Sequence, residues 1–310
     1  MRVLVTGATG FVGSHLIEYL SGCGFETVGL TRRPVGRDAP GRFVVGGSEG
    51  GFQEHLDGID AVVHAAGVAH RSEKDAGKLR KMMLEGNAEW TRRICEAVAE
   101  SQAKALIHIS SIAAADVAGT SDSSASRRDS AYGQSKLLAE GFVGELAQTG
   151  RLAVNLRPPL IYGSGAKGNW PKLVNLAGLP VPLPFGSVRN QRSFLGISNL
   201  CELVRLILGR HNQTDLSGTF PVGDEGFVSL REIVEALRGG MARKSGMFPF
   251  PVSCMDSLLS SIGKASMAEG LFHDLRIDAS DAKSRFDWFP TTETLSGMAK
   301  SLNVSRITWT

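Results

Sequence analysis

Short apolar runs alternate with longer amphipathic stretches through the first 160 residues of this 310-residue chain. The short runs are rich in β-branched residues and predict buried strands at 3–5, 27–30, 61–64, 105–109 and 152–156. The longer stretches repeat apolar positions at helical spacing and predict helices at 11–20, 79–101 and 132–146. Strands joined by helix-length links pair in parallel, and strands that are apolar throughout belong to a sheet covered on both faces. The pattern therefore predicts an α/β fold.

The pattern changes near residue 160. Prolines gather between positions 158 and 184, and the hydrophobic periodicity becomes irregular. Helical stretches return at 200–208 and, behind a Ser229 N-cap, at 230–237. We expect one domain over 1–160 and a smaller α+β domain over 161–310. Whether segments of the second domain return to the first is left open.

Glycine is in excess, and the excess is local. The chain has 37 glycines, and 13 of them fall in the first 60 residues. Gly7, Gly10 and Gly13 are spaced by three between the first predicted strand and the first predicted helix. In such a loop the first glycine allows a tight turn, the second allows close approach of a pyrophosphate, and the third allows the helix to pack on the strand. The loop predicts a Rossmann-type, doubly wound dinucleotide-binding domain over 1–160.

The end of the second predicted strand bears on which dinucleotide is bound. NAD sites usually carry a carboxylate here that accepts from the ribose 2′-hydroxyl. This chain has Thr31, Arg32 and Arg33 instead. An arginine can pair with the 2′-phosphate of NADP, so we favour NADP(H) and keep NAD(H) open. The alternative is a solvated basic turn.

Composition excludes several classes of protein. The 34 basic and 31 acidic residues nearly balance, and basic residues cluster only in short pairs, so no nucleic-acid partner is expected. The four cysteines form no CxxC pair, and no metal site is expected. No apolar run reaches the length of about 18 residues that a membrane-spanning helix needs. The first strand begins at residue 3 without room for a signal peptide, so a cytoplasmic protein is expected.

A candidate catalytic group lies on the helix predicted over 132–146. Tyr132 and Lys136 are four residues apart, which places both side chains on one helix face. A phenol is a poor acid or base at neutral pH, and a neighbouring ammonium would lower its pKa toward the working range. Ser111 follows the strand at 105–109, at the edge where open α/β sheets carry their active sites. Its hydroxyl is suited to polarising a carbonyl or an alcohol.

With this glycine loop, Ser111 and the Tyr132–Lys136 pair, the sequence resembles the extended short-chain dehydrogenase/reductase superfamily, in its nucleotide-sugar epimerase, dehydratase and 4-ketoreductase branch. The resemblance extends in order over nearly the whole chain. Its motifs are TGxxGxxG at 6–13, HAAG at 64–67, Asn87 within 86–91, Ser110–Ser111, YxxxK at 132–136, LRPPLIYG at 156–163, RSF at 192–194 and RFDWFP at 285–290.

The resemblance implies a role for each matching residue. Ser111 would orient the substrate oxygen, Tyr132 would be the acid/base, and Lys136 would bind the nicotinamide ribose and acidify Tyr132. Asn169 and Arg192 would hold the nucleotide diphosphate of a UDP-sugar substrate. With the two arginines above, the expected cofactor-binding residues are Gly7, Gly10, Phe11, Val12, Gly13, Arg32, Arg33, Ala65, Ala66, Gly67, Asn87, Tyr132, Lys136 and Pro158. One departure is Gly46-Gly47-Ser48, where relatives often carry an Asp near the adenine.

The residues after Ser111 narrow the reaction. Dehydratases of this branch carry an acid/base pair there, Asp-Glu or Asp-Lys, and this chain has Ile112-Ala113-Ala114, which cannot move protons. Epimerases at carbons 3 and 5 also need an extra base, often beside that serine; Ile112 supplies none, although a histidine from another loop, His70 or His273, could. We expect an NAD(P)-dependent enzyme that reduces a UDP-4-keto-6-deoxy-N-acetylhexosamine with NADPH for surface polysaccharide. The alternatives are an NAD-dependent UDP-sugar 4-epimerase and, less favoured, a non-catalytic NADP-binding regulator.

The resemblance also suggests a homodimer. In it the stretches 79–101 and 132–146 would form a four-helix interface between two subunits. An exposed amphipathic helix pair is the open alternative.

Overall fold

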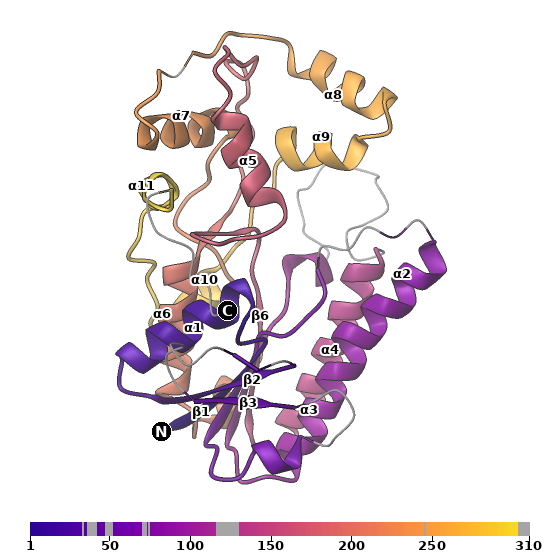
Figure 1. Ribbon diagram of the computed structural model, residues 1–310, viewed down its shortest axis with the longest axis vertical. Helices are drawn as coiled ribbons and strands as arrows, with labels where there is room; N and C mark the ends of the chain where they lie inside the picture. The colour runs from indigo at the N-terminus through magenta and orange to yellow at the C-terminus, as the bar shows by residue number, and fades with distance from the viewer. Residues whose placement is uncertain are drawn as a thin grey trace.

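The computed structural model describes residues 1–32, 34–35, 42–46, 52–69, 73, 75–115, 130–244 and 246–302. Its centre is a seven-stranded sheet in the order β3-β2-β1-β4-β5-β6-β9, with every neighbouring pair parallel (Figure 1). The strands are β1 (Arg2–Thr6), β2 (Glu26–Thr31), β3 (Arg42–Val45), β4 (Ala61–His64), β5 (Ala105–Ile109), β6 (Leu152–Arg157) and β9 (Gly218–Pro221). The Rossmann-type α/β prediction is confirmed.

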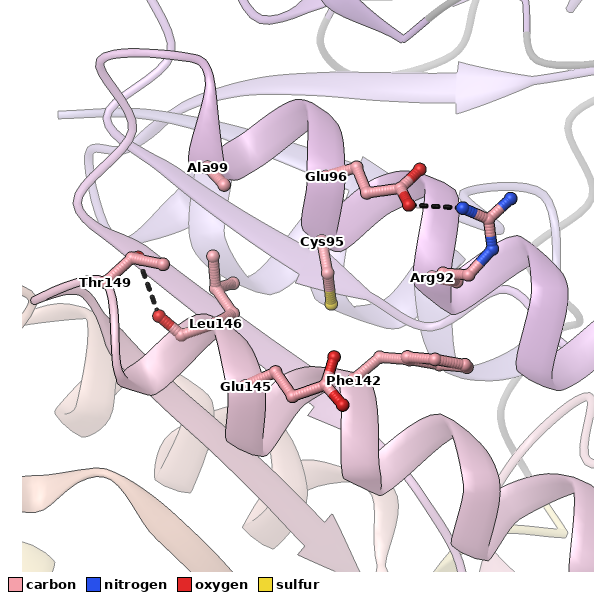
Figure 2. A pocket seen from close by; sticks show the side chains of 8 residues that line it. All are labelled: Arg92, Cys95, Glu96, Ala99, Phe142, Glu145, Leu146 and Thr149. Carbon is pink, nitrogen blue, oxygen red and sulfur yellow. Dashed lines mark hydrogen bonds and ion pairs between the residues drawn. The ribbon is translucent and has the colours of Figure 1, made fainter.

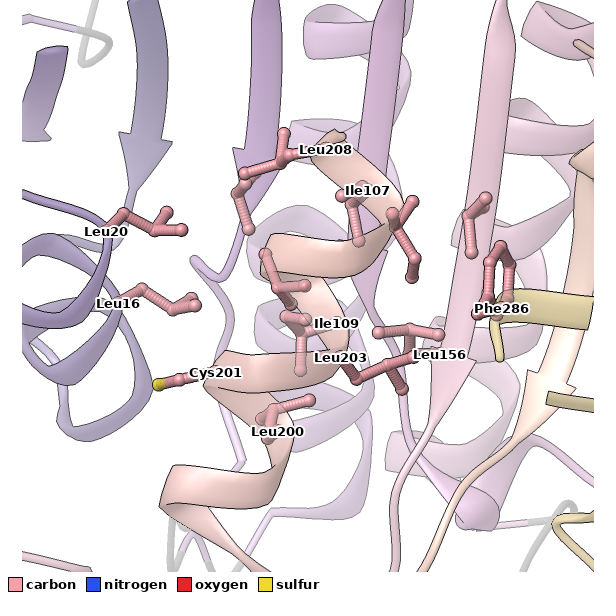
Figure 3. Close-up of a cluster of buried hydrophobic side chains, with 14 of the residues drawn as sticks. Leu16, Leu20, Ile107, Ile109, Leu156, Leu200, Cys201, Leu203, Leu208 and Phe286 are labelled. Atoms are coloured by element: carbon pink, nitrogen blue, oxygen red, sulfur yellow. The ribbon is translucent and has the colours of Figure 1, made fainter. Parts of the chain in front are cut away.

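Helices cover both faces of the sheet because its strands are apolar on both sides. On one face Val3, Val63 and Ile107 pack against α1 (Phe11–Gly22), α6 (Ile197–Leu208) and α10 (Ser280–Phe286), as Figure 3 shows in part. On the other face Leu4 and Leu106 pack against α3 (Trp90–Ala99) and α4 (Ala131–Ala147). Alternate residues of one strand thus serve opposite layers.

The helix predicted over 79–101 is interrupted. The structure has α2 (Ala76–Met83), then a π-helical segment η2 (Leu84–Glu89), then α3. A π-helical segment accommodates extra backbone within a helix, and such segments are frequent at functional sites. Here it contains the buried Asn87, which reaches across to α4. The periodicity alone carried no sign of this.

The remaining elements form a second, smaller region. Its two-stranded parallel sheet pairs β7 (Ile161–Tyr162) with β8 (Leu195–Gly196). Its helices are α5 (Asn169–Ala177), α7 (Leu230–Gly240), α8 (Val252–Ser261), α9 (Ala265–Phe272) and α11 (Thr294–Lys300). The predicted N-cap of α7 is confirmed, since Ser229 and Glu232 form a reciprocal capping box. None of the helices in the described part of the chain has the length and apolar character needed to cross a membrane.

Segments from beyond residue 160 complete the large sheet. β9 pairs with β6 at the edge, and α6 packs into the core beneath β1, β4 and β5. The division of the chain into domains at residue 160 stays a prediction.

Short 3₁₀ helices lie at η1 (Gln53–His55), η3 (Ile112–Ala114) and η5 (Thr214–Leu216).

Candidate active site

The glycine loop joins β1 to α1 with little spare room. Gly7 has a φ of +67°, and a Cβ there would lie 2.8 Å from the backbone of Ala66. A Cβ on Gly13 would lie 2.2 Å from the carbonyl oxygen of Gly7. Gly10 is the N-cap of α1, makes no side-chain cap, and is followed by a first turn without acidic residues. The first-turn amides, from Phe11 onward, therefore present a positive helix end that fits the pyrophosphate of a dinucleotide.

The loop after β4 lies between this helix end and Lys136. The Ala66 amide donates to Thr6 Oγ1 at 3.2 Å, which ties this loop to the end of β1. A Cβ on Gly67 would meet Asn87 Oδ1 at 2.9 Å and would lie 3.8 Å from Lys136 Nζ. The expected cofactor-binding residues Ala65 to Gly67 thus lie between the glycine loop and the lysine.

Asn87 uses its side chain within the protein. Its Oδ1 accepts from the Val68 amide at 2.8 Å, and its Nδ2 donates to the Val68 carbonyl at 3.0 Å and to Ser135 Oγ at 2.9 Å. The Ser135 hydroxyl in turn donates to the carbonyl of Tyr132 at 2.8 Å. Asn87 therefore ties the loop after β4 to the first turn of α4.

Tyr132 and Ser111 come together at the carboxyl end of the sheet. The Ser130 hydroxyl caps α4 by accepting from the Gly133 amide at 2.9 Å, which places Tyr132 in the first turn. Ser111 is the N-cap of η3, and its Oγ accepts from the Ala113 amide at 3.2 Å. The Ser111 hydroxyl lies close enough to the Tyr132 phenol to lower the pKa of Tyr132. Burial raises the pKa of Tyr132 above its ordinary value, and the nearby Ser111 hydroxyl offsets only part of that effect.

Lys136 lies one helical turn further on and is nearly fully buried. Its Nζ donates to the Ile109 carbonyl at 2.8 Å and lies 3.0 Å from Nε2 of His108. Burial lowers the pKa of Lys136 to about 8, and the nearby Glu140 opposes this fall. Burial is the larger influence on the Tyr132 pKa, and the Lys136 ammonium is engaged at the sheet end; the acidifying role of Lys136 stays a prediction.

Glu140 continues the polar face of α4. Its carboxylate accepts from Arg157 Nε at 2.9 Å and Nη2 at 2.5 Å, and from the Ser110 hydroxyl at 2.5 Å. Glu140 and Ser110 are buried. The charge of Glu140 is thus paired with Arg157, and the carboxylate acts on Lys136 through space. The sequence motifs did not identify this pair.

The contacts of the remaining expected cofactor residues say less about a cofactor site. Arg32 is exposed just after β2, while Arg33, Gly47, Ser48 and His70 lie outside the described residues. The buried Pro158 accepts from the Ile112 amide at 2.9 Å through its carbonyl, which ties η3 to the end of β6. The preference for NADP over NAD stays a prediction.

The two residues expected to bind the nucleotide diphosphate, Asn169 and Arg192, each make their own contacts within the protein. Asn169 is exposed at the start of α5, where its Oδ1 accepts from Lys172 Nζ at 3.3 Å. Arg192 Nη1 donates to the carbonyls of Glu269 at 3.1 Å and His273 at 2.7 Å. These carbonyls lie at the C-terminal end of α9, where the helix dipole favours a cation. Arg192 thus secures α9 in this structure, and its role toward a substrate stays a prediction.

A shallow cavity lies on the outer face of α3 and α4, away from these residues. Figure 2 shows the eight residues that line it: Arg92, Cys95, Glu96, Ala99, Phe142, Glu145, Leu146 and Thr149. Its α4 residues begin ten positions after Tyr132, which is about 15 Å along a helix. The cavity is on the helix pair expected to form a dimer interface, and the homodimer stays a prediction.

The comparisons with known proteins agree with this architecture. The model of the NAD-dependent epimerase/dehydratase family matches residues 3–223. A UDP-glucose 4-epimerase from Vibrio cholerae is 30% identical over 300 residues, or 93% of this chain and 90% of that protein. A UDP-2-acetamido-2,6-beta-L-arabino-hexul-4-ose reductase from Pseudomonas aeruginosa is 31% identical over 172 residues, or 55% of this chain and 38% of that protein.

Similarity in three dimensions extends over the whole chain. The crystal structure of UDP-N-acetylglucosamine 4-epimerase from Bacillus cereus has a TM-score of 0.74 at 21% identity, and covers 98% of this chain and 100% of that one. At this identity the match shows the shared fold. Taken with the family match over residues 3–223, it confirms the resemblance read from the motifs. The chain belongs to the NAD-dependent epimerase/dehydratase family and is an NAD(P)-dependent enzyme.

Proposed function

We propose that this enzyme reduces carbon 4 of a UDP-4-keto-6-deoxy-N-acetylhexosamine with NADPH. The observation that carries the proposal is that Ser111 lies beside a protonated Tyr132, with Lys136 one turn away and next to the loop after β4. A relative from Pseudomonas aeruginosa, itself a reductase of a 4-ketohexose linked to UDP, supports this substrate class.

The raised pKa of Tyr132 suits the direction of reduction. A phenol that holds its proton at neutral pH can donate it to the carbon-4 oxygen as that oxygen gains negative charge. The Ser111 hydroxyl, already oriented by the Ala113 amide, would bind the same oxygen. Bound NADPH would supply the hydride. The amides at the start of α1 would hold its pyrophosphate, and Lys136 would hold its nicotinamide ribose.

The surroundings of Ser111 argue against dehydration. Ile112 is buried and packs with Leu275, Ile277 and Ala115. The position where a dehydratase needs an acid/base side chain is therefore part of an apolar cluster. A single hydride transfer needs only one proton donor, and Ser111, Tyr132 and Lys136 are sufficient for it.

A UDP-sugar 4-epimerase is the second candidate. It is favoured by the Vibrio cholerae relative, which matches 300 residues where the reductase matches 172. An epimerase must first oxidise carbon 4, so Tyr132 would have to accept a proton before it donates one. It would also retain NAD through the cycle and need no added cofactor.

One assay separates the two. The purified enzyme is incubated with NADPH and a UDP-4-keto-6-deoxy-N-acetylhexosamine, and the loss of nicotinamide absorbance is followed. One NADPH consumed for each sugar reduced supports the reductase. Interconversion of UDP-glucose and UDP-galactose without added cofactor, with no reduction of the keto sugar, would replace it with the epimerase. An unaltered cellular phenotype in a Tyr132→Phe strain would instead favour a non-catalytic regulator.

The cofactor preference has its own test at Arg32. Replacing an arginine that pairs with the 2′-phosphate removes charge-assisted hydrogen bonds and should weaken NADPH binding about tenfold or more. We expect Arg32→Ala, alone and together with Arg33→Ala, to weaken NADPH binding in a fluorescence titration and to leave NADH binding nearly unchanged. The exposed Arg243→Ala is the matched control. Equal loss for both nucleotides, or for neither, would reject the preference for NADP.

A further inference from the structure

Five neighbouring strands each place a polar residue at one level of the sheet. The parallel register pairs Thr6 with His64, His64 with His108, His108 with Asn155, and Asn155 with Thr219. The first four are buried, although the rest of these strands is mainly apolar. The row passes directly beneath Lys136, whose Nζ lies 3.0 Å from His108.

The hydrogen bonds around His108 define its protonation. Asn155 Nδ2 donates to Thr219 Oγ1 at 3.1 Å and to the Glu140 carbonyl at 3.3 Å, which leaves Asn155 Oδ1 to accept from His108 Nδ1 at 2.8 Å. With its proton on Nδ1, the neutral imidazole has a lone pair on Nε2. The Lys136 ammonium, a pure donor, faces that lone pair.

His64 lies beside the ring of His108 on the neighbouring strand. The two rings stack with centroids 5.5 Å apart and planes 25° apart. The Thr91 hydroxyl donates to the Asn87 carbonyl at 2.7 Å, so it accepts from His64 Nε2 at 3.0 Å, and His64 Nδ1 accepts from Thr6 Oγ1 at 2.7 Å. His64 is therefore held on both of its nitrogens.

The groups that face Lys136 are His108 from β5, His64 from β4, and Glu140 and Tyr132 from α4 itself. Burial and the nearby ammonium lower the pKa of both histidines far below neutrality, so both stay uncharged. An ammonium has three N–H groups. One binds the Ile109 carbonyl and one binds His108, and the third has no acceptor among the described residues.

We propose that neutral His108 is the positioning residue of Lys136: it accepts one N–H of the ammonium and thereby directs the remaining N–H toward a nicotinamide ribose. This inference rests on the proposed function, in which Lys136 binds that ribose. The loop after β4 comes close to Nζ at Gly67, where a Cβ would lie 3.8 Å from it. His108 is the side chain whose loss would free the ammonium from this orientation.

The test compares His108→Phe with His108→Gln, and uses His64→Gln as the control that disturbs the same row without touching Nζ. Phenylalanine keeps a ring but accepts nothing, whereas glutamine keeps an oxygen acceptor. NADPH binding is measured by fluorescence titration without sugar, across pH 6 to 10, and folding is checked by urea unfolding. Loss of a hydrogen bond to a charged group should weaken NADPH binding by His108→Phe about tenfold at pH 7.

The pH profile separates positioning from packing. An acceptor of the ammonium favours its charged form, so its loss should lower the Lys136 pKa further. NADPH binding by His108→Phe should therefore begin to fall at lower pH than in the wild type, while His108→Gln and His64→Gln keep the wild-type profile. A wild-type profile and affinity in His108→Phe, or equal pH-independent losses in all three variants, would overturn the inference. Normal NADPH binding by a wild-type enzyme that turns over none of the sugars would reject the proposed function and leave this comparison valid.

Discussion

Replacing Lys136 with methionine should stabilise the folded protein at neutral pH and abolish its activity. Lys136 is 4% exposed, and its pKa falls from an ordinary 10.5 to about 8. At about 1.4 kcal/mol for each pKa unit, burying the charged form costs the fold roughly 3 kcal/mol. Methionine removes that cost but leaves His108 Nε2 without its donor and weakens the bonding of the Ile109 carbonyl, at about 1 kcal/mol each. We expect Lys136→Met to be about 1 kcal/mol more stable at pH 7.

The stability difference between Lys136→Met and the wild type should change with pH in a defined direction. Below pH 8 the lysine is charged in both the folded and the unfolded chain, so the folded state carries the full cost. Between about 8 and 10.5 the unfolded chain binds the proton more strongly than the folded one, so this group makes the wild type more stable as pH rises. The advantage of Lys136→Met should therefore shrink as pH rises from 7 to 10.

Urea unfolding of both proteins at pH 7 and at pH 9.5 measures this difference, and taking the difference cancels titrations that the two proteins share. Lys104→Met, on an exposed lysine, is the matched control and should change little at either pH. The reasoning fails if Lys136→Met is less stable than the wild type at pH 7. It also fails if the gap between the two proteins is the same at both pH values.

Three further predictions test other parts of the site. Tyr132→Phe should lower kcat by a factor of about 10² or more and leave NADPH binding nearly intact, because it removes a proton donor and little volume; a normal kcat would mean another acid acts. Gly13→Ala places a Cβ 2.2 Å from a loop carbonyl, so its urea midpoint and NADPH affinity should both drop, whereas Gly22→Ala has open space and should change neither. Glu140→Gln removes the buried carboxylate that pairs with the partly buried Arg157 and should cost about 3 kcal/mol in urea unfolding, against almost nothing for the exposed Glu145→Gln. Equal effects of the two glutamines would refute that burial argument.

Local patterns predicted most of the sheet. The strands β4 and β5 begin and end where the predicted runs do, because a strand buried on both faces is mainly apolar along its length. The strand β9 was not predicted: it is four residues long, starts with Gly218 and ends with Pro221. Only its pairing with β6, from more than 60 residues away, makes this segment a strand. Such tertiary pairing leaves no periodic signal in four residues.

The candidate site, like the sheet, has parts that local sequence patterns predict and parts that depend on tertiary structure. The glycine loop and the YxxxK spacing are local, because each acts within one turn or one helix, and the structure brings these residues to one end of the sheet. The contacts of Asn87 could not be predicted from periodicity, since they depend on a π-helical segment. The roles of Asn169 and Arg192 rested on resemblance, and the contacts of Arg192 depend on where α9 lies.

The polar row shows why a motif does not by itself set a pKa. The spacing of Tyr132 and Lys136 puts both on one helix face, and from that alone the ammonium should acidify the phenol. What the ammonium contacts is decided by the strand behind it, where Ile109 and His108 supply acceptors. An apolar residue in place of His108 would leave the same motif with one acceptor fewer for the ammonium. The signal for this was present at positions 6, 64, 108, 155 and 219, but it becomes readable only when the parallel register places those positions in one row. Chains that share the motif can therefore differ in what the lysine contacts, because the strand behind it supplies the acceptors.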